Sequence, residues 1–83
     1  GLRYPFTVET AARLWPGVRD AALVDLGGKA VLAIEGQATY LPSWKTRAAV
    51  FGLHDLRPVI RLPKDRRHHS KVNTAALRKM LGD

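Results

Sequence analysis

The sequence has 83 residues, of which 14 are Lys or Arg and 7 are Asp or Glu, giving a net charge of +7. A chain of this length can form one small domain that buries only roughly 60% of its unfolded surface, so we expect a partner domain to stabilise it. The sequence contains no cysteine, which excludes disulfides and thiolate metal sites. It shows no signal-peptide pattern and no hydrophobic run near the roughly 20 residues that span a bilayer, so we expect a cytoplasmic protein.

The first part of the chain predicts an extended entry followed by a helix. Residues 1–6 form the entry, because Pro5 disfavours the helical region for the residue before it. Thr7 is a suitable helix cap, and the residues that then recur with helical spacing are Val8, Ala11, Ala12 and Trp15. Pro16 and Gly17 end this helix.

A hairpin follows. Residues 18–26 and 29–35 are two apolar runs separated by Gly27-Gly28, which is a turn signal. Both faces of these runs are largely apolar, so we expect the sheet to be covered on both sides.

A second helix and a third strand are predicted next. After a linker at residues 36–42, Ser43 caps a helix that Gly52 closes, with Trp44, Ala48 and Phe51 on one face. Residues 56–62 form the strand, in which Pro58 indicates an edge position or a strand start.

The last segment combines a basic loop with a helix. Between Arg57 and Lys79 there are eight Lys or Arg and one acid, Asp65, a charge distribution that favours polyanionic ligands. Asn73 is a good N-cap for a helix over residues 74–81, and Gly82 stands where a C-cap glycine would. The predicted fold is therefore α+β: a small sheet of about three main strands with helices packed on it, in the order extended entry, helix, strand, strand, helix, strand, helix.

The run Leu62-Pro63-Lys64-Asp65, followed by His69-Ser70-Lys71-Val72-Asn73 and Ala76-Leu77-Arg78, resembles the closing motif of the adenylate-forming enzymes. These include the acyl-CoA synthetases and the adenylation domains of nonribosomal peptide synthetases. Gly1, Tyr4, Val8 and Glu9, and then Pro16-Gly17-Val18, Asp20-Ala21-Ala22 and Val24, are similar to the start of the same domain. Most of that family has glycine where Ser70 stands, and the Arg-His-His-Ser-Lys form resembles a subgroup with the β-lactone synthetases.

The resemblance implies that residues 1–83 are the C-terminal lid domain of an ATP-dependent carboxylic acid ligase, in which Lys71 is the adenylation lysine. By the same resemblance, Gly1 matches a glycine beside the tunnel for the acyl acceptor. Arg67, His69 and Ser70 are further candidates for contacts to the phosphates, the alternatives being surface groups for the first two and a turn role for Ser70. ATP with Mg²⁺ would be bound mainly by a large N-terminal AMP-binding domain of the same polypeptide, so the isolated domain is expected to be inactive. The acyl acceptor would be coenzyme A or a carrier protein, or the acyl group itself in an intramolecular ring closure.

Other functions remain open from the residues alone. The basic cluster also suits a small nucleic-acid-binding module, although no aromatic residue lies within it to stack on single-stranded bases. A protein-interaction module that docks an acidic partner is a third candidate. A zinc site built from His54, His68 and His69 is not expected, because adjacent histidines lack the usual ligand spacing.

Overall fold

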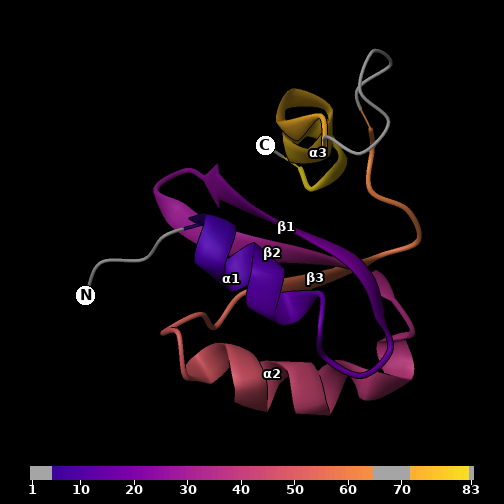
Figure 1. Cartoon of the computed structure of the whole chain (residues 1–83). Helices are drawn as coiled ribbons and strands as arrows, with labels where there is room; N and C mark the ends of the chain where they lie inside the picture. Colours follow the sequence, from indigo (N-terminus) through magenta and orange to yellow (C-terminus); the bar gives the residue numbers. More distant parts are fainter. Residues whose placement is uncertain (1–4, 65–71, 83) are drawn as a thin grey trace.

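A hairpin of two long strands forms the centre of the fold (Figure 1). The structure is a computed structural model, and it describes residues 5–64 and 72–82. β1 (Val18–Leu26) pairs antiparallel with β2 (Lys29–Gly36). The turn residues Gly27 and Gly28 have φ angles of 57° and 85°, a left-handed pair that glycine adopts without strain. The predicted hairpin is therefore confirmed.

A third strand completes a mixed sheet. β3 (Leu56–Val59) pairs parallel with β2, so the strand order within residues 5–64 and 72–82 is β1-β2-β3. Pro58 lies on this edge strand, as predicted. The prediction that the strand continues to Leu62 is wrong, because the backbone N–H of Leu62 donates to the side chain of Glu35 instead of to a strand. The α+β class and the predicted order from the first helix onward are confirmed.

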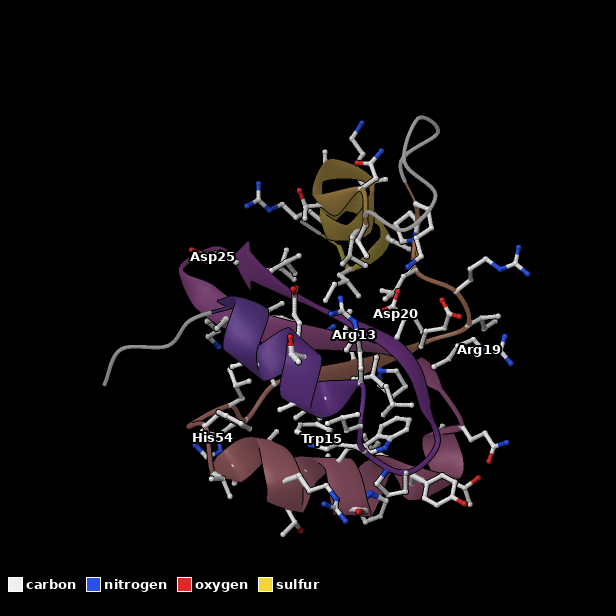
Figure 2. The ribbon with its side chains drawn as sticks, viewed as in Figure 1. Arg13, Trp15, Arg19, Asp20, Asp25 and His54 are labelled. Carbon is white, nitrogen blue, oxygen red and sulfur yellow. The ribbon has the colours of Figure 1, made fainter. Side chains whose placement is uncertain are left out.

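Two helices cover one face of the sheet among the described residues. They are α1 (Pro5–Ala12) and α2 (Leu41–Ala49), the latter preceded by the 3-10 turn η1 (Ala38–Tyr40). Trp44 is fully buried, and its Nε1 donates to the carbonyl of Pro16 at 2.7 Å. Trp15 is also buried, and Figure 2 shows it between α1 and α2. The buried residues of this core are Val8, Ala12, Trp15, Ala21, Leu32, Ile34, Trp44, Ala48, Leu53 and Leu56.

Both of these helices begin earlier than predicted. α1 begins at Pro5, not after a cap at Thr7, because a proline at the first helical position loses no hydrogen bond there. It ends at Ala12, and single turns continue the chain to Trp15. α2 begins at Leu41, because η1 runs directly into it and the Leu41 N–H donates to Ala38. Ser43 therefore lies inside the helix and is not its cap.

α3 (Thr74–Met80) covers the opposite face of the sheet (Figure 1). Asn73 caps it as predicted: its side-chain oxygen accepts from the N–H of Ala76 at 3.1 Å. Gly82 follows with a φ of 98°, as expected past a helix end. The buried residues on this face are Ala22, Val24, Val31, Ala33, Leu62 and Leu77. Cover on both faces is thus confirmed, and residues 31–35 of β2 are buried throughout. Within the part of the chain that the structure describes, no helix has the length and hydrophobicity to cross a bilayer.

Candidate functional site

The residues predicted to carry chemistry lie outside the part of the chain that the structure describes. These are Gly1, Arg67, His69, Ser70 and Lys71. The structure does describe the two ends of the basic loop that contains the last four. We call Leu62, Pro63, Lys64, Val72 and Asn73 the loop base.

The loop base is closed by backbone contacts. Lys64 and Val72 form an antiparallel β-bridge. The N–H of Asn73 donates to the carbonyl of Pro63 at 2.8 Å. Asn73 is also the cap of α3, so the second part of the loop base, residues 72–73, leads directly into that helix. Lys64 and Val72 therefore lie side by side.

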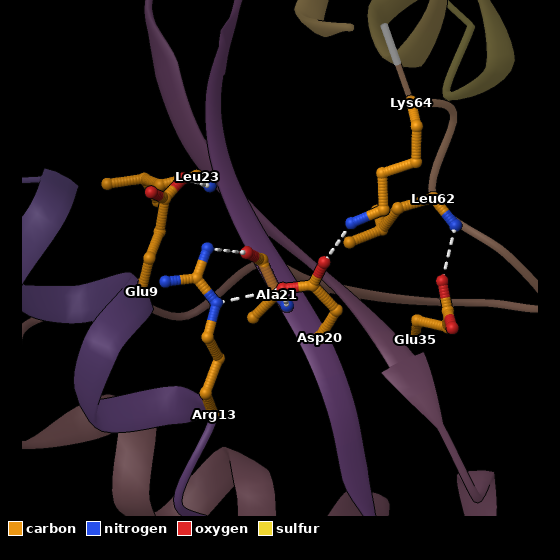
Figure 3. A network of polar contacts seen from close by, with 8 residues as sticks. All are labelled: Glu9, Arg13, Asp20, Ala21, Leu23, Glu35, Leu62 and Lys64. Atoms are coloured by element: carbon orange, nitrogen blue, oxygen red, sulfur yellow. Dashed lines mark hydrogen bonds and ion pairs between the residues drawn. The ribbon is translucent and has the colours of Figure 1, made fainter. Parts of the chain in front are cut away.

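Two acidic residues of the sheet bind the first part of the loop base, residues 62–64 (Figure 3). Oε1 of Glu35, on β2, accepts from the backbone N–H of Leu62 at 2.8 Å. Oδ2 of Asp20, on β1, accepts from Nζ of Lys64. Residues 60–64 thus run from the end of β3 past the end of β2 to β1.

Arg13, just after α1, binds the same carboxylate from the other side. Its Nε donates to Oδ1 of Asp20 at 2.8 Å, and its Nη2 donates to the carbonyl of Ala21 at 3.3 Å. Glu9 of α1 accepts from the N–H of Leu23 at 2.6 Å. Side chains from α1 and the turn after it thereby satisfy backbone groups that an edge strand would otherwise leave unpaired.

The charge on Asp20 is stabilised by its partners. Burial disfavours the ionised form, but hydrogen bonds from Lys64, Arg13 and the N–H of Ala21 outweigh it and lower the pKa of Asp20 below its ordinary value of 3.8. Asp20 lies directly opposite Glu35 in the β1–β2 register. Like charges in that position repel, so the two cations on Asp20 offset an unfavourable pair.

The chemistry that the described part of the loop base offers is one carboxylate bound to two cations. Within residues 5–64 and 72–82, no group of His, Cys, Asp or Glu is placed to hold a metal ion. His54 is exposed and lies near the end of α2, away from Asp20 (Figure 2). The arrangement joins the two ends of a strongly basic segment to each other and binds the first of them to the sheet.

Sequence reasoning missed the roles of Arg13, Asp20 and Glu35. A signal for the two acids was present, because Asp20 and Glu35 are equally far from the Gly27-Gly28 turn. A tight hairpin makes such residues opposite each other. Nothing in the sequence pattern indicated that both acids face the segment before the loop.

Solved structures of large enzymes share this fold. A Mycobacterium tuberculosis fatty acyl CoA synthetase matches 93% of this chain with a TM-score of 0.77 and 17% identity. An ATP-bound RpMatB-BxBclM chimera matches 93% with a TM-score of 0.68 and 20% identity. The unliganded O-succinylbenzoate coenzyme A synthetase (MenE) from Bacillus subtilis matches 92% with a TM-score of 0.64 and 17% identity.

This chain spans 17% of the length of the first and third of these chains and 18% of the second. At such identities the likeness establishes a common fold. The sequence matches no protein-family model and no curated protein.

Proposed function

We propose that this chain is the C-terminal domain of an ATP-dependent, adenylate-forming carboxylic acid ligase, and that Lys71 is its adenylation lysine. The observation that carries the proposal is the loop base: Lys64 pairs with Val72 across the two ends of the basic loop, and the outgoing end is bound to the sheet by Glu35 and Asp20. Lys71 is bonded directly to Val72, so it adjoins a residue that the fold holds in place. The fold shared with coenzyme A synthetases supports the same conclusion.

The first half-reaction explains why a lysine is suited to this position. A carboxylate oxygen attacks the α-phosphorus of ATP, the bond from that phosphorus to the oxygen bridging to the β-phosphorus breaks, and pyrophosphate leaves with the electron pair of that bond. Negative charge on the phosphate oxygens is stabilised by a positioned ammonium group, which acts as a charge and transfers no proton. Lys71 supplies that charge in this proposal, while Arg67, His69 and Ser70 add contacts to the phosphates.

The second half-reaction passes the acyl group from the adenylate to an acceptor. In the proposed enzyme this acceptor is the thiol of coenzyme A or of a carrier protein. In the proposed enzyme Gly1 would stand beside the incoming acceptor, where a missing side chain allows close approach. A parent of the β-lactone-forming type would instead close a ring within the acyl group and use no thiol.

The main partner of the domain in this proposal is an N-terminal AMP-binding domain of the same polypeptide. That domain binds ATP, Mg²⁺ and the acyl substrate, so the 83 residues alone have no ligase activity. An acyl substrate would place the enzyme in fatty acid metabolism in the cytoplasm. Translation of the reading frame upstream of the Gly1 codon tests this directly, because it must encode such a domain.

Pyrophosphate exchange tests the role of Lys71 in the enzyme that contains this domain. Lys71→Ala is expected to slow exchange by orders of magnitude, because the stabilising charge is lost from the transition state. Acyl transfer from a preformed adenylate should be largely retained. Lys45→Ala, which removes an exposed lysine from α2 on the other face of the sheet, is the matched control. An undiminished exchange rate in Lys71→Ala would refute the assignment.

A further inference from the structure

A single carboxylate connects three parts of the fold at the loop base (Figure 3). Asp20 of β1 binds Arg13 through Oδ1 and Lys64 through Oδ2. We propose that Asp20 is a positioning residue, which fixes the loop base on the sheet and thereby sets where the adenylation lysine is presented. This inference rests on the proposed function for the reaction concerned.

The contacts form a continuous path from the sheet to the second part of the loop base, residues 72–73. Asp20 and Lys64 are 44 residues apart in the sequence, and their side chains are 17% and 29% exposed. Lys64 is in turn bridged to Val72 through the backbone. A change at Asp20 therefore acts on Val72 through one intervening residue.

The two acids at the loop base have different tasks. Glu35 accepts from the backbone of Leu62, a contact that any residue except proline could make at that position. Asp20 binds a side chain, so its contact depends on the presence of a cation at position 64. Asp20 thus fixes the register of the segment, whereas Glu35 supports its backbone.

The stability of Asp20 at this position depends on its partners. Asp20 lies opposite Glu35, on a sheet face whose neighbouring residues Ala22, Val24, Val31 and Ala33 are apolar and buried. Two opposed carboxylates repel, and each is stabilised only while its partners are in place. A charged pair of this kind favours one arrangement of its partners over others, which an apolar contact would do less strictly.

Hydrogen exchange in the 83-residue chain tests the physical part of the inference. The reporter is the Asn73 amide, which donates to Pro63 across the loop base. Asp20→Asn is expected to speed its exchange about tenfold relative to amides of β2, because a charge-assisted contact is lost. Asp55→Asn breaks a comparable acid–arginine pair, Asp55–Arg57 at 2.9 Å, and should leave Asn73 unchanged.

Kinetics in the enzyme that contains this domain test the functional part. Asp20→Asn and Lys64→Met should each lower kcat for pyrophosphate exchange about tenfold, with KM for ATP unchanged, and the double variant should be no slower than either. Asp20→Glu should restore part of the rate. Full activity of Asp20→Asn beside an inactive Lys71→Ala would overturn this inference and leave the proposed function standing. If Asp20→Asn accelerates Asn73 exchange but the unaltered enzyme forms no adenylate, the proposed function fails and the role of Asp20 in that reaction fails with it.

Discussion

Asp20 and Glu35 are partners across the β1–β2 hairpin, and both carboxylates contact the segment that leads into the basic loop. Asp20 takes the ammonium group of Lys64, and Glu35 takes the backbone N–H of Leu62. Because the two acids are fixed by the sheet, the segment that they hold is fixed with them. The strongly basic part of the chain is therefore attached to the central hairpin of the fold.

Glu35 should be replaceable by an uncharged acceptor but not by alanine. Glu35 is a buried residue, and its carboxylate satisfies the N–H of Leu62. Glu35→Ala leaves that N–H buried without a protein acceptor, so the free energy of unfolding should fall by about 1–3 kcal/mol. Glu35→Gln keeps an acceptor oxygen and removes the repulsion of Asp20, so it should change stability by less than about 1 kcal/mol. Chemical denaturation of both variants measures the difference, and equal losses would contradict this role.

Asp20 should make the stability of the fold sensitive to acid. Burial opposes its ionisation, but hydrogen bonds from Lys64, Arg13 and Ala21 lower its pKa below the ordinary value of 3.8 in the folded state. The unfolded chain then binds the proton more readily than the native state does, so the stabilisation is complete above pH 3.8 and is lost as the pH falls through the folded pKa.

The pH dependence is measured as the free energy of unfolding between about pH 6 and pH 2.5. The unaltered chain should lose more stability over this range than Asp20→Asn does, because the variant has no proton to bind at that position. If the free energy of unfolding depended on pH in the same way in the two proteins, the carboxylate would not be stabilised by its partners.

The elements of this fold could be predicted where a local pattern determines them. The glycine pair fixed the hairpin, and Asn73 and Gly82 marked the ends of the last helix. The two helix starts were misplaced because Pro5 and Pro42 both lie in first turns, where proline is compatible with a helix. The end of β3 was misplaced because a side chain of β2, and not another strand, receives the Leu62 N–H.

The candidate site could be predicted only in part for a different reason. The residues of the closing motif are near one another in the sequence, so their spacing can be recognised from the sequence alone. Arg13, Asp20, Glu35 and Lys64 meet only after the hairpin pairs and residues 60–64 cross the ends of the strands. Such contacts depend on tertiary packing, which no periodicity within one segment describes.

Asn73 should stabilise both the loop base and α3. Its side chain caps the helix through the N–H of Ala76, while its own N–H binds Pro63. Asn73→Ala should lower stability by about 1 kcal/mol, and Asn73→Asp, which keeps a capping oxygen, should lower it less. The denaturant midpoints of the two variants check this, provided that the unfolding free energy depends equally on denaturant concentration in both. A loss of the same size in both would show that the capping oxygen is not what stabilises the helix.

α3 is attached to the sheet mainly through one side chain. Leu77 is the buried residue within that helix and lies in the core with Ala22, Val31 and Leu62. Leu77→Ala should cost about 2–5 kcal/mol, because it removes buried methyl groups and leaves a cavity between the helix and the sheet. Met80→Ala on the same helix is the matched control, since Met80 is 51% exposed and should change stability by less than about 0.5 kcal/mol.

In a domain this small the loss in Leu77→Ala is comparable to much of the total stability, so partial unfolding should begin at α3 and the loop base. Hydrogen exchange would show this as faster exchange of Asn73 and of the α3 amides than of β2. Simultaneous loss of protection in β2 would mean instead that the two faces of the sheet unfold as one unit.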